Sequence, residues 1–412
     1  MTERVDVLVV GGGPAGLATA HAVAAYGYTV LLVHRDQSIG YPVRTSGGSW
    51  ERSLHGLGLP PHLYHALDSI TFAGPTKQAR IRFGADRPVI LDVTQTYRYL
   101  AALAEQAGVT VACGTSFDQV LEMTPDEVVC RLSHSGISRQ VTARFVVDAS
   151  GHWRAVLSSL GVAQRPQRFG VGVEYEFKNE GGDTTDAVLF VGNEFAPSGY
   201  GWIFPTRSGT VRVGVGIIRP DVKVAPTKLL EGFLQSEAAA QLGLKLGALV
   251  ERHFGVIPSD GQADTFVHGR CIAVGDAAGQ ALPLVGEGIR YGIEAGRRAG
   301  TAISQALREP GRTTHHLSQY SRWWDRTYRR TFAFAQAANL RVSTYSEAQW
   351  DEKVALIALM DGDVMAEFLR MEFSMVRAFR LLRRQPMMAL YRRLRRLWSP
   401  RSSKPGVVAA KA

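Results

Sequence analysis

The feature that most constrains the fold is the start of the chain, where an apolar strand pattern passes through a glycine turn into a helix pattern. Residues 5–10 form an apolar, β-branched run that is typical of a fully buried strand. An alanine-rich helix pattern follows from Pro14 to about Ala25, and a second strand pattern covers residues 28–33. Three glycines have the G-x-G-x-x-G spacing of a dinucleotide-binding βαβ unit: Gly11, Gly13 and Gly16.

These three glycines have different physical roles. Gly11 allows the tight turn, Gly13 lets the backbone approach a pyrophosphate, and Gly16 lets the helix pack closely on the strand. Pro14 and Ala15 open the helix, whose free N–H groups and partial positive charge favour a phosphate. We therefore expect this turn to bind a dinucleotide.

The end of the second strand departs from the usual pattern of such a unit. An acidic residue normally stands about twenty residues after the glycines and binds the ribose. Here the strand ends in His34-Arg35-Asp36, so that a histidine occupies the expected carboxylate position. Two interpretations remain open: Asp36 acts from a displaced position, or His34 makes a weaker contact.

Composition and charge narrow the class of protein. Hydrophobic residues make up 45% of the 412 positions, which is enough for a packed core in two or three domains. The three cysteines form no C-x-x-C pair, which argues against a disulfide framework or a metal site and favours a reducing, cytoplasmic compartment. We expect neither a signal peptide nor a membrane-spanning helix, because the chain enters a core strand at once and contains no apolar run long enough to span.

The pattern along the chain predicts an α/β fold, with a Rossmann-type domain interrupted by a β-rich insertion. Long strands without intervening helices begin at about Phe169, which marks an antiparallel-sheet domain. We expect one helix over 225–249 and helices throughout the chain after Gly311. The expected domains are a discontinuous dinucleotide-binding domain (1–75, 96–165 and 265–310), a β-rich substrate domain (76–95 and 166–264) and a helical C-terminal region (311–412).

Three separated stretches together resemble FAD-dependent enzymes of the aromatic-hydroxylase fold, the group A flavoprotein monooxygenases. They are the N-terminal glycine motif, the turn Asp148-Ala149-Ser150-Gly151, and Gly275-Asp276 followed by Pro283 and Gly286-Glu287-Gly288-Ile289. In that family the Gly-Asp pair holds the ribityl chain of the flavin, and the later Pro and Gly residues lie beside the isoalloxazine. The resemblance implies FAD as the cofactor, with NAD(P)H or another reductant as the electron donor.

The physical chemistry of these positions agrees with the resemblance. A carboxylate such as Asp276 can accept hydrogen bonds from ribityl hydroxyls, and helix N–H groups at Gly286–Gly288 can stabilise negative charge on a reduced flavin. The expected cofactor-binding residues are Gly11, Gly13, Pro14, Ala15, Gly16, His34, Arg35, Asp36, Arg44, Thr45, Arg98, Asp148, Gly151, Gly275, Asp276, Pro283, Gly286, Gly288 and Ile289.

A narrower resemblance comes from Tyr200-Gly201-Trp202-Ile203-Phe204-Pro205, which is followed by Gly214 and Gly216. This stretch is similar to the Y-x-W-x-F-P element of the geranylgeranyl reductase family, which saturates isoprenoid double bonds. On a strand its three aromatic side chains project to one face and form a wall suited to an apolar chain. The same stripe is also compatible with an ordinary domain core.

Two positions depart from that family's pattern. Thr45 stands where several of these reductases carry a cysteine after the stretch that corresponds to Pro42-Val43-Arg44. The FAD-contacting arginine of the family aligns with Val93, which leaves Arg98 as the nearest replacement.

The resemblance implies an FAD-dependent oxidoreductase that reduces C=C bonds of a long apolar, isoprenoid-like small molecule. Hydride passes from reduced flavin to one carbon, and a positioned acid or water supplies a proton to the other. Tyr200, Glu287 and His152 are candidate proton donors, and Arg44, Arg290 and Lys77 could hold an anionic head group. The expected catalytic residues are Tyr200, Trp202 and Glu287; the expected substrate-binding residues are Tyr200, Trp202, Phe204 and Arg290.

Two other functions remain open at this point. A flavin-dependent monooxygenase would share the fold; halogenation fits less well, because Tyr200 replaces the first Trp of the halogenase W-x-W-x-I-P element and no equivalent lysine is evident. A non-catalytic flavin-fold protein associated with membranes is the third interpretation, because the usual ribose carboxylate is missing.

The formal charge of +10 belongs to the end of the chain. Eleven of the 47 basic residues fall in the last forty positions, and no acidic residue follows Glu372. A helix over 387–398 would be amphipathic and basic, which favours either an anionic membrane surface or docking on the protein itself. Nucleic acid is not expected as a partner, because no nucleic-acid-binding motif is present.

Overall fold

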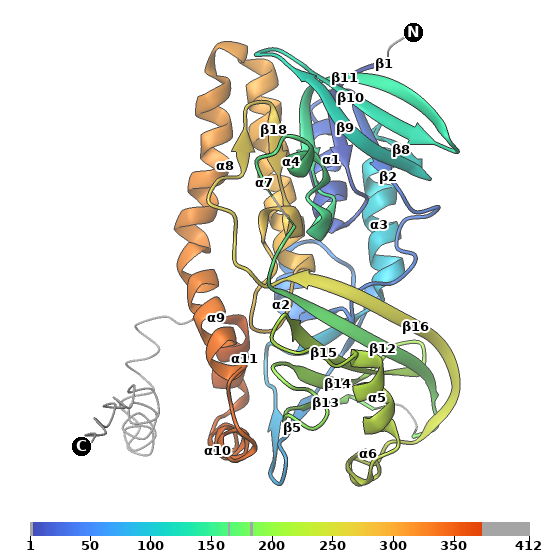
Figure 1. The fold of residues 1–412 in the computed structure, drawn as a ribbon, viewed down its shortest axis with the longest axis vertical. Coiled ribbons are helices and arrows are strands. Elements are labelled where there is room, and N and C mark those ends of the chain that lie inside the picture. Colours follow the sequence, from blue (N-terminus) through green and yellow to red (C-terminus); the bar gives the residue numbers. More distant parts are fainter. Residues whose placement is uncertain (1–2, 164, 182–183, 373–412) are drawn as a thin grey trace, which may run out of the picture. The chain divides into compact units, whose positions relative to one another are not determined.

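The computed structural model describes residues 3–163, 165–181 and 184–372. Its N-terminal strand, β1, is a central strand of a mainly parallel sheet (Figure 1). Residues Val7 to Val9 of β1 are fully buried, because its neighbours β2 and β11 pair with it in parallel and helices cover the sheet. The strands follow the order β17 (Val267–His268), β18 (Cys271–Ala273), β11 (Ile137–Asp148), β1 (Glu3–Val10), β2 (Val30–His34) and β8 (Thr110–Cys113), with β10 (Val128–His134) and β9 (Thr115–Met123) attached through β11.

Helix packing on this sheet depends on small residues. Helix α1 (Pro14–Ala24) lies against α7 (Ile289–Arg308), and a Cβ at Gly296 of α7 would stand 2.3 Å from the carbonyl oxygen of Ala15. Because the carboxyl ends of parallel strands share one edge, the turns that follow β1, β2, β11 and β18 converge there.

A second, seven-stranded sheet is antiparallel except where β13 pairs with β5, and Figure 1 shows its long strands β12 and β16 side by side. One face packs valines, among them Val173, Val213 and Val215, against helix α5 (Pro226–Leu234). Its order is β16 (Leu246–Pro258), β12 (Phe169–Asn179), β15 (Thr210–Arg219), β14 (Tyr200–Pro205), β13 (Asp186–Phe190), β5 (Ser69–Ala73) and β6 (Gln78–Arg82). The α/β class with an antiparallel insertion is therefore confirmed.

The helix expected over 225–249 is wrong. The structure has two short helices, α5 (Pro226–Leu234) and α6 (Glu237–Gln241), and then the edge strand β16 from Leu246. The Ser236 side chain caps α6, and Gly243 adopts a positive φ of 73° after it. Pairing with β12 then overrides the helical tendency of residues 246–249, as tertiary context commonly does.

The remaining elements connect the two sheets or cover them. The boundary expected at residue 75 falls inside the β5–β6 hairpin, whose two strands both belong to the second sheet. A small sheet is formed by β3 (Gly48–Trp50), β7 (Pro88–Leu91) and β4 (Tyr64–Ala66). The other helices are α2 (Glu51–Gly56), α3 (Val93–Gln106), α4 (Ala155–Ser159) and the short 3-10 helices Pro61–Leu63, Gly151–Trp153, Gly275–Ala278 and Pro310–Arg312.

Helices also follow Gly311, as expected, as far as the structure is described. They are α8 (Thr313–Thr327), α9 (Arg329–Val342), α10 (Glu347–Ile357) and α11 (Gly362–Arg370). The chain clusters into two units, Met1–Ala366 and Glu367–Ala412, and the basic helix expected over 387–398 lies outside the described residues. Within the described ranges, no helix has both the length and the apolar character that crossing a bilayer requires.

Candidate functional site

A cavity of about 480 Å³ lies at the edge where the parallel strands end. It extends from the N-terminus of α1, past the turns after β2 and β11, to the N-terminus of α7 and the 40–45 loop. The cavity brings together most of the expected cofactor residues: Gly11, Gly13, Pro14, Ala15, His34, Arg35, Asp36, Arg44, Thr45, Gly151, Gly275, Asp276, Gly286, Gly288 and Ile289.

The three glycines of the first turn differ in what surrounds them. A Cβ at Gly11, which has a φ of +115°, would stand 2.2 Å from the carbonyl oxygen of Ala149. A Cβ at Gly16 would stand 2.0 Å from the carbonyl oxygen of Gly11, so Gly16 serves helix packing and lies outside the cavity. At Gly13 no protein atom lies within 4 Å of that position, and no side chain caps α1. The helix N-terminus is therefore open toward the cavity.

His34 occupies the position where a carboxylate was expected, and hydrogen bonds define its state. Its Nδ1 accepts from the backbone N–H of Gly12 at 3.2 Å, and its Nε2 lies 3.3 Å from the Asp36 carboxylate. This arrangement requires the neutral ring with the proton on Nε2. Burial lowers the pKa of His34, which agrees with a neutral ring.

Asp36 is held by the loop opposite it. Its two oxygens accept hydrogen bonds of 2.6 and 3.1 Å from the Arg44 guanidinium, a bidentate pair. Although burial opposes ionisation, the Arg44 pair lowers the pKa of Asp36. Asp36 therefore joins the end of β2 to the 40–45 loop and at the same time lines the cavity.

Asp276 presents a carboxylate to the cavity with no hydrogen-bond donor among the described residues. Burial raises the pKa of Asp276 to about 6, and Arg154 only partly opposes this. The turn that carries it is rigid: Gln280 Oε1 accepts from Gly275 N at 2.7 Å, and Gln280 Nε2 donates to the Tyr320 hydroxyl at 2.8 Å. A fixed acceptor without a donor fits a ligand that carries hydroxyl groups.

The opposite end of the cavity is formed by the start of α7. Gly288 precedes the helix without a side-chain cap, so its first N–H groups also remain available for a ligand. Tyr200 donates its hydroxyl to the carbonyl oxygen of Val285 at 2.6 Å, which attaches β14 to this loop. Glu287 is not among the residues that line the cavity, and it accepts hydrogen bonds of 2.8 Å from Ser49 and from Arg290.

Some expected cofactor residues lie outside the cavity. Arg98 is exposed, and α3 contributes Val93 and Tyr97 instead. Asp148 is fully buried and accepts hydrogen bonds from Ser150 Oγ and Leu157 N, so it shapes the turn after β11. Pro283 is buried, and its carbonyl oxygen accepts from the side chain of Asn339 at 3.0 Å.

Several cavity residues were not predicted from the sequence. Tyr97, Trp153, Val256 and Ile257 line the cavity, the last two from the edge strand β16, beyond the residues 225–249 that were expected to be helical. His152 also lines it; burial, together with nearby arginines, lowers the pKa of His152 to about 4. A usable signal was Asp92, whose side chain caps α3 so that the helix begins at Val93, and this start sets which of its residues face the cavity.

The aromatic stripe of β14 lies beside the cavity without lining it. The rings of Tyr200 and Trp202 are 5.8 Å apart, and those of Trp202 and Phe204 are 6.2 Å apart. The three side chains share one face, as the strand period requires. Arg290, expected beside them, is buried and stacks on Tyr291.

A model of the FAD binding domain family matches residues 4–334. The chain belongs to this family. It is similar to digeranylgeranylglycerophospholipid reductase 2 of Methanothermobacter thermautotrophicus, with 31% identity over 332 residues, 78% of this chain and 83% of that protein. The expected resemblance to geranylgeranyl reductases and the expected FAD cofactor are therefore confirmed, and the chain is an FAD-dependent oxidoreductase.

Solved structures agree on the fold of this flavoprotein. A geranylgeranyl bacteriochlorophyll reductase-like protein of Thermoplasma acidophilum superposes with a TM-score of 0.81 at 22% identity, covering 93% of this chain and 99% of that one. The p-nitrophenol 4-monooxygenase of Pseudomonas putida superposes with a TM-score of 0.67 at 17% identity, covering 90% and 99%. At these identities the likeness concerns the fold alone.

The cavity of this flavoprotein fits FAD. The open position at Gly13, the uncapped start of α1 and the Asp276 carboxylate match a pyrophosphate followed by a polyhydroxyl chain. The second uncapped helix, α7, offers a further partial positive charge at the other end of the cavity.

Proposed function

We propose that this protein saturates C=C bonds in the isoprenoid chain of a lipid, as the name of its archaeal relative indicates for that enzyme. The observation that carries the proposal is the contact between Tyr200 and Val285. It attaches an aromatic strand face to the loop that forms one end of the FAD cavity. An apolar chain on that face would lie next to the flavin.

We propose the following division of work among the residues. Gly13 and the start of α1 hold the pyrophosphate, Asp276 holds the ribityl chain, and the start of α7 faces the ring. Reduced FAD, when bound, supplies hydride to one carbon of the double bond. The aromatic face of Tyr200, Trp202 and Phe204 excludes water and orients the substrate.

The three candidate proton donors differ in their surroundings. Tyr200 already donates its proton to a carbonyl, and burial raises the pKa of Tyr200 to about 12, so it is a weak acid. His152 is neutral above about pH 4 and therefore carries no spare proton at pH 7. Glu287 Oε2 is buried without a hydrogen-bond partner among the described residues, and we propose that this unpaired acceptor relays a proton from water to the substrate.

The reaction can be tested with purified protein, dithionite as the reductant and a geranylgeranylated glycerophospholipid, under anaerobic conditions. We expect products heavier by 2 mass units for each reduced bond. A product heavier by 16 units, formed only with oxygen and NAD(P)H, would instead establish a monooxygenase. Protein without flavin absorbance near 450 nm that takes up no added FAD would contradict both activities.

Because the pKa of Asp276 is raised, we expect the affinity for FAD to depend on pH. Hydroxyl donors stabilise the ionised carboxylate, so the pKa of Asp276 should fall from about 6 when FAD binds, and binding should release a proton. The Kd for FAD should therefore rise as the pH falls from 7 to 5, by up to about tenfold per pH unit below 6. Fluorescence titration checks this, and Asp276→Asn should bind more weakly and lose this slope. An unchanged slope in Asp276→Asn would contradict the assignment.

We further propose that the basic segment near the C-terminus binds anionic membranes. Its apolar side chains would share one face of a helix, and each basic residue near an anionic surface contributes on the order of 1 kcal/mol. Deletion of residues 385–412 should abolish co-sedimentation with phosphatidylserine-containing liposomes, and neutral liposomes provide the control. Undiminished sedimentation of the truncated protein would exclude this role. The apolar residues are Met387, Leu390, Tyr391, Leu394, Leu397 and Trp398.

A further inference from the structure

The indole of Trp202 lies flat against the sheet because the residues beneath it are glycines, which have no side chains. A Cβ at Gly214 would stand 2.3 Å from the indole, and Cβ atoms at Gly216 and Gly172 would stand 3.4 and 3.5 Å from it. Gly214 lies directly opposite Trp202 in the β14–β15 pairing. The ring therefore rests on backbone of β12 and β15, and only 7% of the residue is exposed.

One polar contact determines how this ring is turned. The indole Nε1–H donates a hydrogen bond of 2.6 Å to Glu174 Oε2, and Glu174 stands on the neighbouring part of β12. An indole N–H can only donate, so the oxygen that receives it must be free to accept. Glu174 is itself only 3% exposed.

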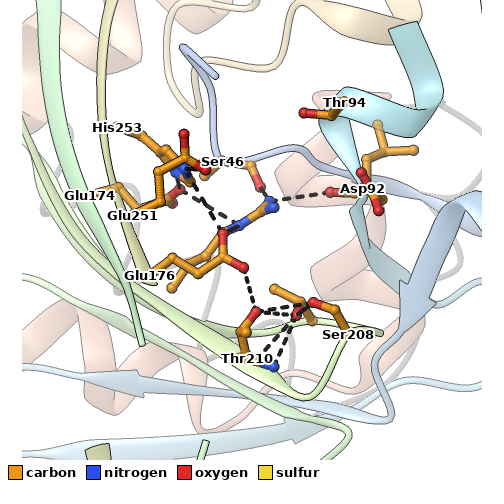
Figure 2. Close-up of polar contacts among 12 residues, drawn as sticks. Ser46, Asp92, Thr94, Glu174, Glu176, Ser208, Thr210, Glu251 and His253 are labelled. Atoms are coloured by element: carbon orange, nitrogen blue, oxygen red, sulfur yellow. Dashed lines mark hydrogen bonds and ion pairs between the residues drawn. The ribbon is translucent and has the colours of Figure 1, made fainter. Parts of the chain in front are cut away.

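Glu174 is in turn fixed by two basic side chains, in the cluster that Figure 2 shows. His253 Nδ1 lies 2.8 Å from Glu174 Oε1, and Arg212 Nε lies 3.8 Å from the same oxygen. Arg212 also binds Glu176 at 2.9 Å. His253 Nε2 faces Glu251 at 3.2 Å and Glu176 at 3.9 Å.

The charges of this cluster explain why it can exist in the interior. Two buried carboxylates, Glu174 and Glu176, face the basic side chains of Arg212 and His253. Burial alone would lower the pKa of His253, but the hydrogen bond to Glu174 and the neighbouring Glu251 outweigh it and raise the pKa. Glu174 is thus fixed by His253 and Arg212 on one side and accepts the indole N–H on the other.

We propose that Glu174 is a positioning residue for substrate binding, which acts by fixing the plane of the Trp202 indole against which an unsaturated apolar chain lies. This inference rests on the proposed function, because it takes Trp202 as part of the substrate surface. The inference assigns a role to the buried Glu174 side chain, which lines neither the FAD cavity nor the expected substrate surface.

The test compares Glu174→Ala and Glu174→Gln with the matched control Glu176→Gln. The control removes a carboxylate from the same cluster but leaves the Trp202 contact in place. In Glu174→Ala the KM for the geranylgeranyl lipid should rise about tenfold, with little change in kcat or in FAD affinity. Glu174→Gln keeps an oxygen acceptor for the indole and should recover most of this loss, and it serves as the readout if Glu174→Ala does not fold.

A double-mutant cycle separates positioning from general stability. Adding Trp202→Phe to Glu174→Ala should raise KM no further than Trp202→Phe alone, because both changes remove the same hydrogen bond between the indole and Glu174. Additive effects, or an equal rise of KM in Glu176→Gln, would overturn the proposal.

A spectroscopic readout does not depend on the reaction. The ¹H–¹⁵N indole resonance of Trp202 should shift in Glu174→Ala and stay in place in Glu176→Gln. If the wild-type protein reduces no isoprenoid, the proposed function fails, and this resonance still decides whether Glu174 orients the indole. An unmoved resonance in Glu174→Ala would contradict the positioning role.

Discussion

Gly13→Ala is expected to produce a folded protein that no longer retains FAD, whereas Gly16→Ala should disrupt the turn itself. The backbone of Gly13 has φ −80° and ψ 175°, which alanine adopts without strain, and no protein atom lies near its Cβ position. The new methyl group would instead occupy the space where backbone N–H groups meet a pyrophosphate. Loss of one or two such charge-assisted hydrogen bonds, about 3 kcal/mol, weakens binding about 100-fold.

The two glycines should differ in stability as well as in binding. A Cβ at Gly16 would stand 2.0 Å from the carbonyl oxygen of Gly11, so α1 must move away from β1. We expect Gly16→Ala to lower the unfolding temperature of the FAD-free protein and Gly13→Ala to leave it unchanged. Gly232→Ala in α5, where a Cβ also meets no atom within 4 Å, controls for glycine replacement as such. Equal FAD affinity of Gly13→Ala and wild type would contradict the phosphate role.

Arg212→Met is expected to destabilise the fold by about 3–5 kcal/mol, because it leaves two buried carboxylates with one fewer cation. The guanidinium pairs with Glu176 and also donates hydrogen bonds of 3.2 Å to the carbonyl oxygens of Ser46 and Leu91. Those carbonyls belong to the segments next to the 40–45 loop and α3, which line the FAD cavity. The substitution should therefore also weaken FAD binding.

Urea denaturation with and without added FAD measures both effects. Arg212→Met combined with Glu176→Gln should recover part of the stability, since the second change removes one uncompensated charge. Arg80→Met provides a control, because Arg80 pairs with Asp186 at the exposed side of the same sheet. Such exposed pairs contribute about 0–1 kcal/mol, so the control should lose little stability. A loss in Arg212→Met no larger than in this control would contradict the buried-charge interpretation.

Sequence patterns predicted the FAD turn because its determinants are local. The strand, the three glycines and the helix lie within residues 3–24, and each glycine has the steric reason that its spacing suggests. Arg98 shows that, in a helix, an error of one position in the sequence selects a side chain on the wrong face. It is one position from Tyr97, about 100° around the helix, and that rotation separates the exposed face from the cavity.

Strand β16 shows a different failure. Its first residues, 246–249, continue an apolar, helix-compatible pattern, and only pairing with β12 makes them a strand. Their partners lie about seventy positions earlier in the chain, where no local pattern indicates them. Val256 and Ile257, further along this strand, reach the cavity only because β16 pairs with β12.

By itself, the sequence determined the fold class, the nucleotide turn and the aromatic face of residues 200–204, because glycine spacing and strand alternation act over a few residues. Only the tertiary structure decided that Asp276 faces the cavity without a donor, that Asp36 is bound by Arg44, and that the Trp202 indole binds Glu174. Those facts depend on which buried polar groups from distant segments become neighbours. Each such group takes whichever partner the packed chain brings within about 3 Å, and local patterns do not encode that choice.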